Sequence, residues 1–193
     1  FDTTRANIEF SGATAIDIPV KEGKDFDSDY PFKGNLDITL LQQLIKKHGK
    51  NIAAVIVTVT NNSGGGQPVS MENMKAVSAL CKKNKLLCIL DCCRVAENAY
   101  FIKHREKAYA NHSYRQIAQQ MFALADGAIM SAKKDALVNM GGFLAVADKK
   151  LADACMNLLI ITEGFSTYGG LSGRDMEAIA VGLKEVFDDD YLN

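Results

Sequence analysis

Three polar segments, each directly after an apolar run, hold the residue types that could do chemistry in this chain. The first contains Asn62 within a glycine-rich turn, and the second places Asp91 shortly before Arg94. The third contains Ser131 and Lys134. Together they offer a carboxylate, a guanidinium, a nucleophilic amine and neutral hydrogen-bonding groups. Such a set suits a site that holds a flat or anionic ligand and attacks a carbonyl carbon.

Each segment also has a simpler interpretation when it is taken alone. The glycine-rich turn matches neither of the glycine motifs that bind nucleotides, and is typical of a flexible loop. Asp91 and Arg94 suit a structural ion pair. The intervening Cys92 and Cys93 suit packing, and the two adjacent lysines of the third segment are typical of a solvated surface. Only the combination of the three segments indicates one shared site.

That combination favours a pyridoxal 5′-phosphate site. This cofactor needs a lysine that forms a Schiff base with its aldehyde, and an acid that keeps its pyridine nitrogen protonated. Lys134 and Asp91 fit these two roles. Arg94 or Asn62 can donate to the phenolic oxygen, and Ser131 can donate to the phosphate. The spacing alone does not decide which of the two adjacent lysines forms the bond.

Buried strands must position these residues. Near-continuous apolar runs are typical of strands that are buried on both faces. They occur at 14–20, 52–59, 86–90, 127–130 and 142–146. Segments with helical spacing lie between them, and two further helices are expected at 149–159 and 172–187. The alternation predicts an α/β fold, a mostly parallel sheet with helices on both faces. Ligands bind such sheets at the carboxyl ends of the strands, where the polar segments begin.

Composition excludes several classes of protein. The 193 residues are 48% hydrophobic and 23% charged, as expected of a folded domain rather than a disordered chain. The net charge of −1 argues against nucleic acid as a partner. No apolar run approaches the roughly 18 residues of a membrane span. The five cysteines show no C-x-x-C pair, which argues against a disulfide framework or a zinc site and favours a reducing cytoplasm.

The motifs resemble those of the aromatic amino-acid β-eliminating lyases, the family of the tryptophanases and tyrosine phenol-lyases. The resembling segments cover essentially the whole chain and lie at 1–4, 58–70, 91–103, 131–144 and 168–183. The resemblance implies the large, pyridoxal phosphate-binding domain of the aspartate aminotransferase fold, known as fold type I. Residues 1–193 would form the core of that domain, without the family's N-terminal segment and C-terminal small domain. It also implies a homo-oligomer, a tetramer in the family.

The resemblance assigns roles to single residues. Asp91 would pair with the pyridine nitrogen, Arg94 and Asn62 would reach the phenolic oxygen, and Ser131 would bind the phosphate. Lys134 would be the Schiff-base lysine, with Lys133 beside it. Phe1 would stack on the cofactor ring, and Asp2 would act on the substrate. The backbone carbonyl of Asn139 would contribute to a potassium site, so potassium is a possible second cofactor.

The implied substrate is a small molecule, the amino acid L-tryptophan, and the implied reaction is its β-elimination with water to indole, pyruvate and ammonia. Asp2 favours tryptophan because the family's tryptophan enzymes carry Asp at this position and its tyrosine enzymes carry Thr. Elimination of tyrosine is the nearest alternative, and a noncatalytic subunit of the same fold is a second. A nicotinamide-dependent oxidoreductase is disfavoured because G-x-G-x-x-G is missing. We expect little or no turnover from the isolated 193 residues.

Overall fold

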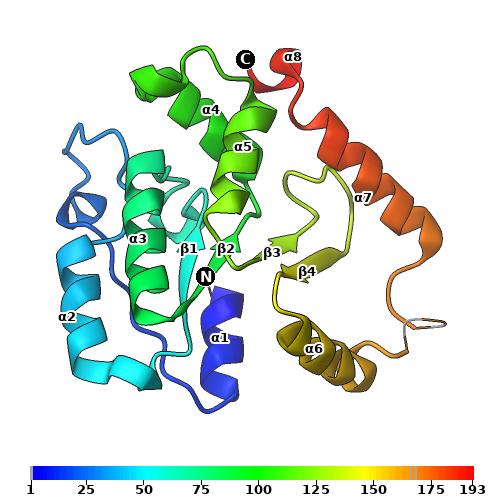
Figure 1. Ribbon diagram of the computed structural model, residues 1–193. Coiled ribbons are helices and arrows are strands. Elements are labelled where there is room, and N and C mark those ends of the chain that lie inside the picture. The colour runs from blue at the N-terminus through cyan, green and yellow to red at the C-terminus, as the bar shows by residue number, and fades with distance from the viewer. Residues whose placement is uncertain (1, 166, 168) are drawn as a thin grey trace.

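The computed structural model describes residues 2–165, 167 and 169–193 (Figure 1). Within these residues the sheet has four strands, and their spatial order follows the order of the chain. β1, β2 and β3 are parallel, whereas β4 runs antiparallel to β3. The strands are β1 (Ala54–Thr58), β2 (Leu87–Asp91), β3 (Gly127–Ser131) and β4 (Gly142–Val146). The predicted α/β class with a mostly parallel sheet is confirmed.

Helices connect and cover the strands. Figure 1 shows α2 next to α3, α4 next to α5, and α6 next to β4. The helices are α1 (Asp2–Phe10), α2 (Ile38–His48), α3 (Met71–Asn84), α4 (Val95–Arg105), α5 (Tyr114–Ala123), α6 (Lys149–Thr162), α7 (Gly173–Glu185) and α8 (Asp189–Leu192). In the described part of the chain, no helix has both the length and the apolarity needed to cross a membrane.

Local sequence signals explain where several helices begin. Asp37 caps α2 by accepting a hydrogen bond from the backbone N–H of Leu40 at 2.9 Å. Ser70 caps α3 in the same way. Ser113 and Gln116 form a reciprocal capping box at the start of α5. Such caps satisfy N–H groups that have no partner inside the helix, and each stabilises the helix by about 1 kcal/mol.

The hydrophobic core surrounds β1, β2 and β3. Val57 and Leu90 of the strands are almost completely buried, and they belong to one cluster with Val77 of α3 and Ile117 of α5. Val57 and Leu90 are paired in register and lie on one face of the sheet, which is buried, whereas the residues between the buried ones are half-buried. The predicted burial of both faces is therefore wrong for one of the two faces. The core therefore fixes the three parallel strands, and with them the positions at which their carboxyl ends emerge.

One predicted strand is wrong. The segment 14–20 is not a strand but an extended connection. Its β-pairing consists of a single isolated bridge between Pro19 and Leu36. Proline cannot donate a backbone hydrogen bond, so a ladder cannot continue through it. Ile16 is also half exposed, because no second strand covers this segment.

The acidic C-terminus also differs from expectation. The run 188–190 is expected to lie unfavourably at the carboxyl end of a helix. In the structure Asp188 caps the start of α8 and accepts from the N–H of Asp190 at 2.8 Å. Acidic residues at the N-terminus of a helix are electrostatically favourable. A break after Phe187 separates α7 from α8, and the acidic run begins the second helix rather than ending the first.

Candidate cofactor site

The three polar segments meet at one edge of the sheet because the three strands that precede them are parallel and in register. Thr58 of β1 is paired with Asp91 of β2, which is paired in turn with Ile129 of β3. The chain leaves each strand at the same end. Residues as distant in the sequence as Asn62 and Lys134 thereby line one edge of the sheet, as the sequence predicts.

A cavity of about 430 Å³ lies at this edge of the sheet. Its volume falls in the range of small-molecule sites, roughly 300–1,000 Å³. It is lined by all six residues that the sequence places at strand ends, together with six others. The lining residues are Thr3, Thr4, Thr58, Asn62, Asp91, Cys93, Arg94, Ile129, Met130, Ser131, Lys133 and Lys134.

Asp91 is the buried charge of the cavity. Its side chain ends β2 and the residue is only 7% exposed. The hydroxyl of Thr58 and the backbone N–H of Cys93 donate long hydrogen bonds to it, at 3.5 and 3.4 Å. No ion pair joins Asp91 to Arg94 or to another described residue. The structural ion pair that the two residues suggest in isolation is therefore not formed, and the carboxylate is left for a cationic ligand atom.

Asn62 and Arg94 approach the cavity from two different loops. Asn62 opens a short 3₁₀ turn, which the preceding Asn61 stabilises by accepting from the N–H of Gly64 at 3.1 Å. Gly65 then adopts φ +80°, a left-handed conformation that favours glycine. Arg94 is held by its backbone, which donates to the carbonyl of Val59 at 3.0 Å. Both side chains offer N–H donors to a ligand oxygen.

The loop after β3 brings Ser131 and both lysines to the cavity. The backbone N–H of Ser131 donates to the Sγ of Cys93 at 3.1 Å, which joins this loop to the end of β2. Lys134 is half-buried, whereas Lys133 is exposed. Both lysines line the cavity, and the lower exposure of Lys134 is the difference between them.

The two cysteines beside Asp91 differ in their surroundings. Cys92 is fully buried, and its thiol donates to the carbonyl of Ile129 at 3.2 Å. Burial raises the pKa of this thiol to about 12. The packing role predicted for Cys92 is confirmed. Cys93 instead lines the cavity, and burial raises its pKa too, so both thiols stay protonated near neutral pH.

For three predicted site residues the structure gives no contact with the cavity, and for two of them the relevant atoms are not described. Phe1 lies outside the described residues, and the position of the Asp2 side chain is not described. Asn139 is exposed and does not line the cavity. Among the described residues no cluster of three His, Cys, Asp or Glu side chains could hold a metal ion. The potassium contact through a backbone carbonyl stays a prediction.

Sequence reasoning missed Thr3 and Thr4 as cavity residues. They lie in the first turn of α1, which puts the start of the chain beside the strand ends. The available signal was their position directly after the two residues that the resemblance assigns to the site. No local pattern shows that α1 docks there, because the docking depends on contacts with distant strands.

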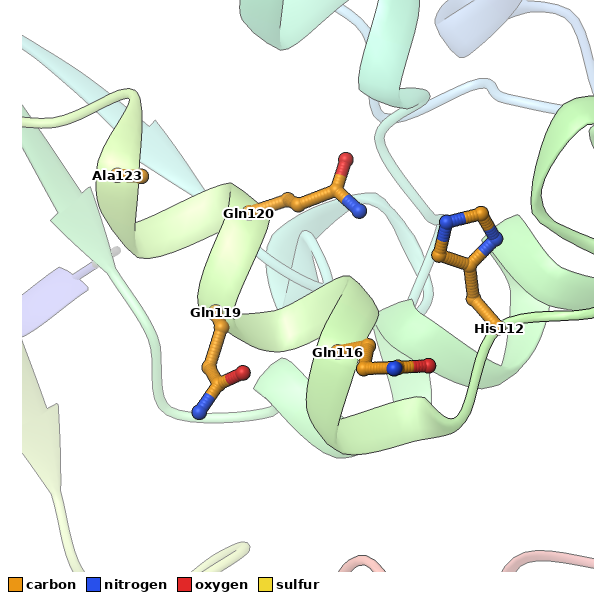
Figure 2. A pocket seen from close by; sticks show the side chains of 5 residues that line it. All are labelled: His112, Gln116, Gln119, Gln120 and Ala123. Atoms are coloured by element: carbon orange, nitrogen blue, oxygen red, sulfur yellow. The ribbon is translucent and has the colours of Figure 1, made fainter.

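A second, shallower cavity of about 350 Å³ lies along α5. Figure 2 shows the side chains of Gln116 and Gln120 extending toward the side on which His112 lies, while Gln119 points away. The Nδ1 atom of His112 is buried and has no hydrogen-bond partner in the described structure. This cavity contains no carboxylate, lysine or arginine, so it does not compete with the first as a site for the predicted chemistry.

Comparisons with known proteins agree with the geometry of the strand ends. A sequence profile described as β-eliminating lyase matches residues 1–186. The chain belongs to the β-eliminating lyase family. It is 55% identical over 192 residues to a tryptophanase of Salinibacter ruber. It is 48% identical over 193 residues to a tyrosine phenol-lyase of Pasteurella multocida. Each match covers 100% of this chain, but only 41% and 42% of those relatives.

Solved structures with low sequence identity support the fold of this β-eliminating lyase chain. A SepCysS-SepCysE N-terminal domain complex covers 100% of the chain with a TM-score of 0.57 and 15% identity, and the match spans 45% of that chain. An N-acetylornithine aminotransferase from Stenotrophomonas maltophilia covers 82% with a TM-score of 0.53 and 16% identity, over 38% of its length. The fold is that of the pyridoxal phosphate-dependent enzymes of fold type I.

The β-eliminating lyases depend on pyridoxal phosphate, and the cavity fits this cofactor. The decisive observation is Asp91, a buried carboxylate with two long hydrogen bonds and no ion pair among the described residues. Burying an unpaired charge is costly, and a protonated pyridine nitrogen would pair it. Arg94 and Lys134 bring a guanidinium and an amine to the same cavity, so the donor set suits the cofactor.

Proposed function

We propose that residues 1–193 form the core of the cofactor-binding large domain of an enzyme that converts L-tryptophan and water to indole, pyruvate and ammonia. The chain spans about two fifths of the length of the curated relatives it matches, so the activity is proposed for the intact protein. The observation that carries the proposal is the cavity that gathers Asp91 and Arg94 from the end of β2 and Lys134 from the end of the neighbouring β3.

In this proposal Asp91, Arg94, Asn62 and Ser131 hold the cofactor. The buried carboxylate of Asp91 accepts a hydrogen bond from the protonated pyridine nitrogen and stabilises its charge. The guanidinium of Arg94 and the amide of Asn62 donate to the phenolic oxygen, and Ser131 donates to the phosphate. Pyridoxal phosphate, when bound, supplies a sink for the electrons of the substrate Cα–H bond.

Lys134 has two roles in the proposal. Its amine would hold the cofactor covalently. When it is free, the same amine would act as the base that takes the proton from the substrate Cα. Lys133 also lines the cavity but does not bond the cofactor. Phe1, which lies outside the described residues, would stack on the cofactor ring.

Asp2 determines the leaving group in this proposal. Indole has an N–H but no hydroxyl, so a carboxylate near the ring can accept its hydrogen bond and stabilise the positive charge that forms when C3 is protonated. Elimination of tyrosine is the second candidate, because tyrosine phenol-lyases are also among the relatives, at 46–48% identity. Thr3 and Thr4 line the cavity directly after Asp2, which supports a position of Asp2 near the substrate.

Three further properties belong to the same proposal. The intact protein assembles from identical subunits, and the backbone carbonyl of Asn139 contributes to a potassium site. It works in the cytoplasm, which is supported by five cysteines that are all free in the structure. The isolated 193 residues show little or no turnover, because their relatives are more than twice as long.

The substrate assignment is tested by Asp2→Thr in the intact protein. We expect kcat/KM for L-tryptophan to fall by about 100-fold, as when one transition-state donor or acceptor is lost. Elimination from an S-alkyl cysteine should change far less, because a thiolate is a good leaving group and does not need a carboxylate to stabilise a protonated ring. Release of indole, phenol and thiol measures the three reactions.

Matched controls separate this role from a folding defect. Asp17→Thr removes a carboxylate that pairs with Arg5 of α1 but does not line the cavity, and it should leave both reactions near wild type. Equal losses on both substrates in Asp2→Thr would contradict the role of Asp2. A wild-type preference for L-tyrosine would transfer the assignment to the second candidate.

A further inference from the structure

Asp135, the residue after Lys134, is a buried carboxyl that the proposed chemistry does not use. It is 5% exposed and does not line the cavity. Its Oδ2 accepts a hydrogen bond at 2.6 Å from the backbone N–H of Ala96, which lies in the first turn of α4. The loop that carries Lys134 is thereby bonded to the helix that follows Arg94.

The start of α4 needs this bond because it has no cap of its own. Arg94 occupies the N-cap position and makes no side-chain cap hydrogen bond. The first N–H groups of a helix have no partner inside it, and a side-chain oxygen that accepts from one of them stabilises the helix. Asp135 supplies that oxygen from a distant part of the chain. Its own N–H donates to the carbonyl of Cys93 at 3.2 Å, so two bonds join the segments.

The other side of the loop is fixed by α7. Ala136 is fully buried, and a Cβ at Gly182 of α7 would lie 1.8 Å from the carbonyl oxygen of Ala136. The helix and the loop backbone are therefore in direct contact. The N–H of Leu137 donates to the carbonyl of Lys134 at 2.9 Å and closes the turn. Lys134 is held between α4 and α7, with its side chain at the cavity.

We propose that Asp135 is a positioning residue, whose bonds to the segment 93–96 hold the backbone of Lys134 so that its amine points into the cavity beside Arg94. The inference rests on the proposed function, since it takes Lys134 as the lysine that carries the cofactor. Asp135 touches neither cofactor nor substrate and acts through Lys134. It also places Arg94 and Lys134 in fixed relation, because one carboxyl bonds the segments that carry both.

The test compares Asp135→Ala with Asp135→Asn in the intact protein. After borohydride reduction, a peptide map gives the fraction of protein that carries the cofactor on Lys134. We expect this fraction to fall about tenfold in Asp135→Ala at subsaturating cofactor, and to stay within about twofold of wild type in Asp135→Asn, whose amide oxygen still accepts the Ala96 bond. Asp37→Ala is the matched control, because it removes a helix cap of the same kind from α2.

A second readout does not need the cofactor. Hydrogen exchange of the Leu137 amide in the cofactor-free protein should be about tenfold faster in Asp135→Ala and unchanged in Asp37→Ala. Wild-type exchange and a wild-type yield of the Lys134 adduct in Asp135→Ala would overturn the positioning role and leave the proposed function intact. A wild-type protein whose adduct lies on another residue contradicts the proposed function itself, and overturns this inference before any substitution is made.

Discussion

α3 and α6 have the same length, 14 residues, and lie in two regions of the molecule with opposite surroundings. α3 packs on the parallel strands and buries six residues, whereas α6, next to the antiparallel β4, buries none among the described ones. α6 is nevertheless rich in apolar side chains. Its exposed ones are Met156, Leu158, Leu159, Ile160 and Ile161.

The difference shows that apolar spacing determines the helix but not its burial. The run in α6 predicts a helix at 149–159, and the helix is present. β4 shows the same contrast, since its residues are mostly exposed while those of β2 are mostly buried. Apolar surface of this extent is typical of an interaction surface. The site described above lies on the buried region, at the ends of the parallel strands.

The largest expected effect is on the rate of elimination, and it compares a substitution at the end of β2 with one at the start of α6. Asp91→Ala in the intact protein should lower the rate of elimination by about 1,000-fold or more, because an unprotonated pyridine ring is a poor electron sink and each 1.36 kcal/mol of barrier is about tenfold in rate. Asp148→Ala, which removes the cap of α6, is the matched control and should stay within about threefold of wild type. Similar losses in both would show that the effect is general destabilisation.

The next effect compares one leucine from each region. Leu90→Ala in β2, where the residue is 1% exposed, should lower the free energy of unfolding by about 2–5 kcal/mol. Leu158→Ala in α6, where the residue is 65% exposed, should change it by less than about 0.5 kcal/mol. Urea unfolding of the 193-residue chain measures both. Equal losses would mean that α6 is as well packed as β2, and would contradict the difference in burial between the two regions.

The smallest expected effect is the pH dependence of the free energy of unfolding that the buried carboxyl of Asp135 causes. Burial raises the pKa of Asp135 to about 7, against the lowering effects of the Ala96 and Glu97 N–H groups and of Arg94. The other titratable groups that face it are the Glu97 carboxylate and the Cys92 thiol. Between about pH 4 and 7 the folded protein holds a proton that the unfolded chain has lost. Stability should therefore fall as the pH rises through this window.

Asp135→Asn removes the carboxyl whose protonation differs between the folded and the unfolded protein. Its free energy of unfolding should depend less on pH than that of the wild type between about pH 4 and 7, and the two curves should run parallel above pH 8. Urea unfolding at a series of pH values measures the slopes. Equal slopes below pH 7 would show that Asp135 ionises in the folded protein as it does in the unfolded chain.

Much of the sheet could be predicted because the apolar runs of β1, β2 and β3 are nearly unbroken, although only one face of these strands is buried and the other is half-buried. The run at 14–20 is also rich in β-branched residues, yet Pro19 and the lack of a neighbouring strand leave it without a ladder. The antiparallel direction of β4 was not predicted. Direction depends on how the chain returns to the sheet, which composition does not record.

The site could be predicted as far as parallel strands force their ends together. Asn62, Asp91, Arg94 and the third segment reach one cavity for this reason. The choice between Lys133 and Lys134 could not be made from spacing, because both belong to the same loop and both reach the cavity. The part played by α1 was also out of reach, since its position depends on contacts with the finished sheet.

The central claim is that Lys134 carries pyridoxal phosphate at the ends of the parallel strands. Borohydride reduction of the intact protein, followed by a peptide map, tests it most directly. We predict a reduced cofactor adduct on Lys134, which is lost in Lys134→Ala and retained in Lys133→Ala. An adduct on Lys133, or one that survives Lys134→Ala, would contradict it.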